Sequence, residues 1–171
     1  LMQRRGAFNT SLEETEYLDR CRLKTARLFE AACVLGRDSV GGDDSDVVAL
    51  FGHRIGLAFQ MLDDVLDIAG PVERTGKARG TDLLDGTVTL PFIEAAKVDP
   101  TLRDYDLASL DEVAAEALCD RISATGALDS VRSRAMGLIE EAKAGLTGTA
   151  IEPGQRKLLD LIADGVVLRY S

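Results

Sequence analysis

Three aspartates close together in one predicted helix are the residues of this sequence best placed to do chemistry. Asp67 lies four positions after Asp63 and three after Asp64, and Gln60 precedes them by one turn. At these spacings, side chains project from one side of an α-helix. Like charges so placed destabilise a helix, so a cation should neutralise them, and clustered carboxylate oxygens suit Mg²⁺. The alternative is a solvated acidic face, which describes most acidic triplets on helices.

Basic residues in two other segments complement the aspartates. Lys77 and Arg79 stand between glycines in the loop after the aspartate helix, where backbone N–H groups can approach an anion. Lys24, followed by Thr25, lies on the preceding predicted helix and would reach the same anion if the two helices pack antiparallel. Aspartates that hold cations, with lysines nearby, predict a diphosphate site. For an isolated lysine, plain surface charge is the commoner explanation.

Helical periodicity dominates the elements that must position these residues. Ser11 and Glu14 have the spacing of a capping box, which predicts the start of a helix that Gly36 ends. A second long helix should cover residues 46–69 and carry the aspartates, followed by a glycine-rich loop over 70–88. Four further helices are predicted, at residues 91–97, 108–125, 127–146 and 154–169. No segment shows sustained period-two alternation, so we predict an all-α fold, an antiparallel helical bundle.

The composition excludes several classes of protein. With 46% hydrophobic and 29% charged residues, the 171-residue chain can form one domain with a core. Its net charge of −9 argues against a nucleic-acid partner, because a phosphate backbone would be repelled. No apolar run approaches the roughly 20 residues that cross a bilayer. Cys21, Cys33 and Cys119 show no CxxC spacing, so we expect reduced core cysteines in a cytoplasmic protein.

The order of these motifs resembles that of the trans-isoprenyl (polyprenyl) diphosphate synthase family, over essentially the whole chain. The shared motifs are Lys24-Thr25, Phe51-Gly52, Gly56 through Gln60, Asp63-Asp64-Val65-Leu66-Asp67, Gly76-Lys77, Asp82 through Gly86 and Thr89-Leu90-Pro91. The resemblance implies a bundle of the isoprenoid synthase type. The family's first aspartate-rich motif has no counterpart here. Residues 1–171 would therefore be the C-terminal part of a single synthase domain, and the bundle would be incomplete.

The resemblance also implies an activity, that of a trans-prenyltransferase. The family condenses an allylic diphosphate with isopentenyl diphosphate through Mg²⁺-assisted ionisation. It assigns the metal to three carboxylates, those of Asp63, Asp64 and Asp67. It assigns catalysis to four polar side chains, those of Lys24, Thr25, Gln60 and Lys77, of which the two lysines bind the diphosphate. One departure is Thr87, which stands where the family commonly has lysine.

Three hypotheses about the chain's role follow. We expect it to be a truncated part of a synthase, inactive alone, whose parent is a homodimer. The first alternative is a natural subunit of a heteromeric prenyl synthase, which completes its site with a partner chain. The second is a class I terpene cyclase. Cyclases line their pockets with aromatic side chains, and this sequence has only 5% aromatic residues and no tryptophan, which favours a synthase.

Overall fold

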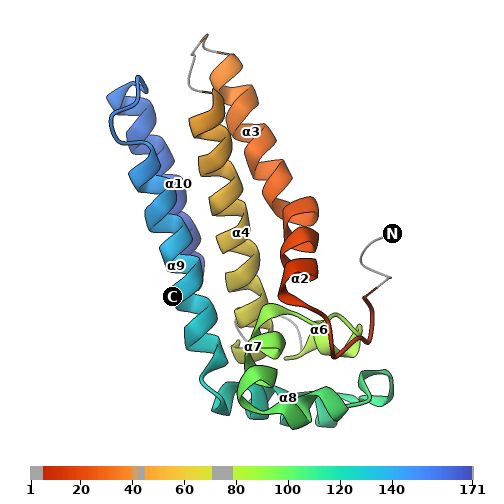
Figure 1. Ribbon diagram of the computed structural model, residues 1–171. Helices are drawn as coiled ribbons and strands as arrows, with labels where there is room; N and C mark the ends of the chain where they lie inside the picture. The colour runs from red at the N-terminus through yellow and green to blue at the C-terminus, as the bar shows by residue number, and fades with distance from the viewer. Residues whose placement is uncertain (1–5, 40, 42–44, 71–78, 171) are drawn as a thin grey trace. The chain divides into compact units, whose positions relative to one another are not determined.

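The computed structural model describes residues 6–39, 41, 45–70 and 79–170, and every regular element within this part of the chain is a helix (Figure 1). The predicted all-α fold is confirmed. The chain divides into two compact units: the first unit is Leu1–Arg20 with Met61–Ser133, and the second unit is Cys21–Gln60 with Arg134–Ser171. None of the described helices is long and apolar enough to cross a membrane.

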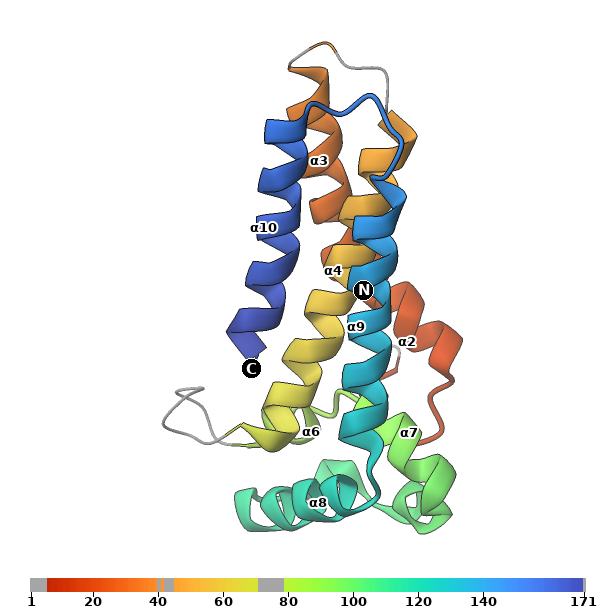
Figure 2. The ribbon, with the colours of Figure 1, turned by 90° about the vertical axis from the view of Figure 1, so that its left-hand side faces the viewer.

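The second unit is built from long helices that lie side by side (Figures 1 and 2). Its elements are the π-helix η1 (Arg22–Ala26), α3 (Arg27–Asp38), the first part of α4 (Ser45–Ala69), the last part of α9 (Ala127–Gly145), and α10 (Pro153–Tyr170). Glycines on α4 allow a close approach to η1 and α3. A Cβ atom at Gly56 would lie 2.6 Å from the Cα of Ala26, and one at Gly52 would lie 2.6 Å from the carbonyl oxygen of Phe29. The glycine motifs seen in the sequence therefore serve helix packing.

The first unit combines the end of α4 and the start of α9 with several short helices. Its elements are α2 (Glu14–Cys21) up to Arg20, the end of α4, α6 (Thr81–Leu84), α7 (Leu90–Val98), the 3-10 turns η2 (Pro100–Asp104) and η3 (Leu107–Ser109), α8 (Glu112–Ala124), and the start of α9. Large side chains from all of these regions are fully buried, among them Tyr17, Ile68, Leu83, Phe92, Leu102 and Leu118. The end of α4 that carries the aspartates is thus anchored in an apolar core.

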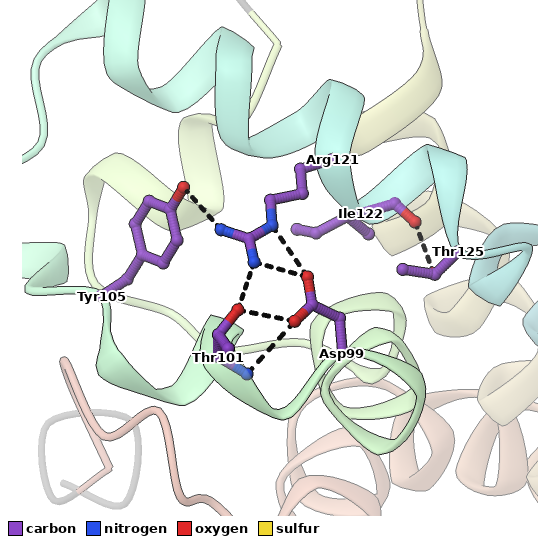
Figure 3. A network of polar contacts seen from close by, with 6 residues as sticks. All are labelled: Asp99, Thr101, Tyr105, Arg121, Ile122 and Thr125. Atoms are coloured by element: carbon purple, nitrogen blue, oxygen red, sulfur yellow. Dashed lines mark hydrogen bonds and ion pairs between the residues drawn. The ribbon is translucent and has the colours of Figure 1, made fainter.

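One arginine on α8 fixes the segment between α7 and α8 (Figure 3). The guanidinium of Arg121 donates to the Asp99 carboxylate, with Nη2 2.5 Å from Oδ2, and also to the hydroxyls of Thr101 and Tyr105. Asp99 in turn accepts from the backbone N–H of Thr101 at 3.2 Å, which caps η2. The arginine therefore holds three points of one irregular segment at once.

The predicted first helix is wrong in three details. The helix begins at Glu14 and not directly after Ser11, whose backbone N–H donates to the Asn9 side chain at 3.1 Å. The glycine expected to end it, Gly36, lies inside α3, which continues to Asp38. Between α2 and α3 the chain also forms a π-helix, which the sequence did not indicate.

The later helices match their predictions closely. The ranges 46–69, 91–97, 127–146 and 154–169 correspond to α4, α7, α9 and α10. The helix predicted from residue 108 starts at Glu112, because the Asp111 side chain caps it by accepting from the Ala114 N–H at 2.8 Å. The predicted loop over 70–88 contains a short helix, α6, while residues 71–78 lie outside the described part of the chain.

Candidate functional site

The three aspartates all lie on α4, in the part that belongs to the first unit, but their environments differ. Asp64 is buried, with only 3% of its surface exposed, whereas Asp63 and Asp67 are half-buried. The acidic triplet predicted from the sequence is therefore present on one helix, and its members are not equivalent.

Backbone N–H groups near the start of α6 contact Asp67 at the end of α4. The N–H of Gly80 donates to the Asp67 carbonyl at 2.9 Å, and the N–H of Asp82 donates to its carboxylate at 3.2 Å. Gly80 has φ +71°, a left-handed conformation that favours glycine, and it precedes the first residue of α6. Of the backbone N–H groups expected to approach a ligand anion, that of Gly80 thus binds the protein's own carbonyl and that of Asp82 its own carboxylate.

Negative charge is crowded around Asp67. Burial raises the pKa of its carboxyl from the ordinary 3.8 to about 7, and the neighbouring charges of Asp82 and Asp63 add to the rise. Hydrogen bonds from the backbone of Asp82 and Thr81 oppose it. A desolvated carboxylate beside two others would be stabilised by a cation, and its oxygen donors are of the kind that Mg²⁺ prefers.

The carboxylates do not form a ready-made cage. Within the described residues, no three His, Cys, Asp or Glu side chains gather closely enough to hold a metal ion by themselves. Mg²⁺ seldom needs such a cage, because it keeps several waters and takes one or two carboxylates together with substrate phosphate oxygens. The donor set of Asp63 and Asp67 therefore fits this ion in its usual mode of binding.

Asp64 is held by a tyrosine from another helix. The hydroxyl of Tyr17, on α2, donates to Oδ2 of Asp64 at 2.7 Å, and Tyr17 is completely buried. The guanidinium of Arg20 lies 5.6 Å from the centre of the Tyr17 ring and donates to the Val88 carbonyl. Tyr17 was not among the predicted site residues, because a tyrosine on the apolar face of a helix is indistinguishable in sequence from an ordinary core residue.

Of the two basic residues of the loop, the structure describes the contacts of Arg79 only. Arg79 donates through Nε to the Ile68 carbonyl at 2.9 Å and pairs through Nη1 with the Asp120 carboxylate at 2.9 Å. It therefore links the end of α4 to α8, and the expectation that it lies near a ligand anion stays a prediction. Lys77 lies outside the described residues, so its assignment to a diphosphate stays a prediction.

In the second unit, the structure brings together two other predicted residues. The Thr25 hydroxyl donates to Oε1 of Gln60 at 2.8 Å, and Gln60 is only 5% exposed. Lys24 precedes Thr25 on η1 and is exposed. A π-helical turn inserts one residue into the helical repeat and is frequent at functional sites. The assignment of Lys24 to the same anion as the aspartates stays a prediction.

Comparisons with known proteins agree with this fold. A sequence model of the family described as "Polyprenyl synthetase" matches residues 1–118. The geranylgeranyl diphosphate synthase of Methanosarcina mazei is 38% identical over 160 residues, which are 91% of this chain and 48% of that protein. Component 2 of the heptaprenyl diphosphate synthase of Geobacillus stearothermophilus is 48% identical over 81 residues, which are 46% of this chain and 25% of that protein.

A solved structure gives the same result. The polyprenyl synthase of Caulobacter crescentus CB15, complexed with calcium and isoprenyl diphosphate, superposes with a TM-score of 0.88 at 31% identity, over 99% of this chain and 54% of that one. The protein is thus an all-α protein of the isoprenoid synthase fold. The chain belongs to the polyprenyl synthetase family, and the resemblance seen in the sequence is confirmed. It spans about half the length of the relatives it matches along most of its own length.

Proposed function

We propose that this chain is the part of a polyprenyl diphosphate synthase that binds a substrate diphosphate through Mg²⁺. The observation that carries the proposal is the half-buried Asp67 carboxylate crowded by Asp63 and Asp82, a charge arrangement that a divalent cation would relieve. The reaction would be the condensation of an allylic diphosphate with isopentenyl diphosphate, the activity expected of the family. We retain the cytoplasmic location predicted from the sequence, and residues 1–171 as the C-terminal part of one synthase domain, within this proposal.

The predicted residues keep their roles in this function. Asp63, Asp64 and Asp67 would hold Mg²⁺, Asp64 directly or through water, and Lys24 and Lys77 would bind the diphosphate oxygens. When bound, Mg²⁺ neutralises negative charge that develops on a departing diphosphate. The Thr25 hydroxyl points its proton at Gln60, which leaves the hydroxyl oxygen lone pairs available beside a developing allylic cation.

A heteromeric enzyme is the second candidate. It is favoured by the 48% identity to a protein named as component 2 of a heptaprenyl diphosphate synthase. In that case a partner chain would supply the first aspartate-rich motif. The two candidates share the same diphosphate site, so they differ only in what completes it.

The test is Mg²⁺-dependent binding of an allylic diphosphate to this chain, followed by calorimetry. We expect binding in Mg²⁺ and little in chelator, and we expect Asp63→Asn to weaken it at least tenfold. Asp104→Asn, an exposed substitution in η2 with the same change of charge, should bind like the wild type. Equal binding with and without Mg²⁺, or by the Asp63 variant, would contradict the proposal.

A condensation assay with labelled isopentenyl diphosphate then separates the two candidates. Activity that appears only when a co-purified second prenyl-synthase-like chain is added supports the heteromer. Activity that appears only in a longer product of the same gene supports a single-chain synthase.

A further inference from the structure

The acidic triplet of α4 divides into two parts by burial. At about 100° per residue, Asp67 lies between the other two, roughly 40° around the helix from Asp63 and roughly 60° from Asp64, and Asp63 and Asp64 lie roughly 100° apart. Asp63 and Asp67 are half-buried, whereas Asp64 is 3% exposed. Asp64 therefore faces a different part of the first unit from the other two.

The side that Asp64 faces contains a specific partner. The Tyr17 hydroxyl donates to Oδ2 of Asp64 at 2.7 Å, a length usual for an O–H···O hydrogen bond. Residue 17 and residue 64 belong to α2 and α4, so the bond joins two helices of the first unit. A buried carboxylate that lost this donor would incur the desolvation penalty of an unsatisfied charged group.

Tyr17 is itself held in place from two directions. Its ring is fully buried, and the Arg20 guanidinium lies 5.6 Å from the ring centre. Arg20 also donates to the backbone carbonyl of Val88, which anchors it outside α2. The phenol therefore has little freedom to follow the Asp64 carboxylate, and instead fixes it.

We propose that Tyr17 is a positioning residue for the metal site: it holds the Asp64 carboxylate toward α2 and thereby sets the rotation of α4 that presents Asp63 and Asp67 to the cation. This inference rests on the proposed function. Partners that hydrogen-bond the carboxylates of a metal site commonly change metal affinity by about ten- to a hundredfold when they are removed. Asp64 then acts through its bond to Tyr17, and its contact with the metal is indirect.

The experiment is a double-mutant cycle on Mn²⁺ affinity in the presence of inorganic pyrophosphate, measured by calorimetry. We expect Tyr17→Phe to weaken Mn²⁺ binding about tenfold or more in the wild-type background, and to have little effect in an Asp64→Ala background. The matched control is Tyr105→Phe, which removes a hydroxyl that bonds Arg121 in the same unit, and it should bind like the wild type. Equal effects of Tyr17→Phe in both backgrounds, or none in either, would overturn the inference.

Loss of the metal site as a whole is distinguishable from loss of the positioning role. If the wild-type chain binds neither Mn²⁺ with pyrophosphate nor Mg²⁺ with an allylic diphosphate, the proposed function fails and this inference fails with it. If Tyr17→Phe does not fold, fluorine NMR of the chain labelled with fluorotyrosine takes its place, with signals assigned from Tyr105→Phe and Tyr170→Phe. Mg²⁺ with pyrophosphate should then shift the Tyr17 signal in the wild type but not in Asp64→Ala, and an unmoved wild-type signal would refute the inference.

Discussion

Replacing Asp67 by asparagine should stabilise the metal-free protein at neutral and higher pH. The asparagine has the same shape, and its amide oxygen can still accept from the backbone N–H of Asp82. It removes a charge that burial and the neighbouring Asp82 and Asp63 disfavour in the folded state. The substitution therefore relieves the electrostatic penalty while it keeps the hydrogen bond from the Asp82 backbone.

The size of the effect follows from the pKa. Folding raises the pKa of Asp67 from 3.8 to about 7, and each pKa unit corresponds to about 1.36 kcal/mol, which gives an upper bound near 4 kcal/mol. Solvent screening of a half-buried carboxylate reduces this to roughly 2 kcal/mol. Because the folded state binds the proton more tightly, the contribution of protonated Asp67 to the stability of the wild type is fully present below pH 3.8. It is lost as the pH rises to about 7.

The assay is urea unfolding followed by circular dichroism at about pH 4 and about pH 8. We expect Asp67→Asn to exceed the wild type by roughly 2 kcal/mol at the higher pH and to match it closely at the lower one. Asp104→Asn, an exposed substitution, should change stability by no more than about 0.5 kcal/mol at either pH. Addition of Mg²⁺ with pyrophosphate should stabilise only the wild type and the Asp104 variant. An Asp67 variant less stable than the wild type at pH 8, or equally shifted at both pH values, would refute the electrostatic reasoning.

Two further predictions concern the packing of the glycines on α4 and the contacts of Arg121 on α8. Gly56→Ala places a Cβ 2.6 Å from the Cα of Ala26 and should lower the free energy of unfolding by about 1–3 kcal/mol. The control Gly137→Ala places a Cβ that meets nothing within 4 Å, and it should raise the free energy of unfolding by about 0.5–1 kcal/mol. Similar urea midpoints for the two variants would contradict the close helix packing at Gly56. Arg121→Lys should lower the melting temperature nearly as much as Arg121→Met, because a lysine cannot reach Asp99 and the two hydroxyls at once. A lysine variant that melts like the wild type would show that the several N–H donors of the guanidinium are not needed for stability.

The helices were predictable from the sequence where local signals agreed. The helix α4 combines an apolar periodicity with a polar start and a Gly-Pro stop, and the predicted range 46–69 differs from Ser45–Ala69 by one residue. The first helix failed at both ends because two weak local signals were overruled. The backbone N–H of Ser11 donates to the Asn9 side chain before the helix begins. Gly36 lies inside α3, at a position where a Cβ would meet nothing within 4 Å. The π-helix at Arg22–Ala26 left no pattern in its five residues by which it could have been found.

The sequence indicated which residue types form the candidate site, but it did not indicate their hydrogen-bond partners. Side-chain spacing on one helix identified the aspartates, since that information is local. The partners come from segments that fold back on α4: the Tyr17 hydroxyl lies 47 positions before Asp64 in the chain, and the Asp82 N–H lies 15 positions after Asp67. Arg79 shows the same limit, because its charge predicted a ligand while its contacts are with the Ile68 carbonyl and Asp120. Long-range contacts decide which polar residues remain available for a ligand, and a single sequence does not contain them.

The two aspartates with described partners differ in how the fold holds their side chains. Asp64 accepts a hydrogen bond from the buried Tyr17 hydroxyl, so its side chain contributes to the fixed geometry of the first unit. Asp67 accepts backbone hydrogen bonds that are too weak to offset its burial and its acidic neighbours, so its pKa stays raised. A carboxylate left in this condition weakens the metal-free fold and gains most from a cation. The raised stability expected of Asp67→Asn and the loss of metal affinity expected of Tyr17→Phe are therefore consequences of the same arrangement. A hydrogen bond fixes the Asp64 carboxyl, whereas burial and acidic neighbours keep the pKa of Asp67 raised.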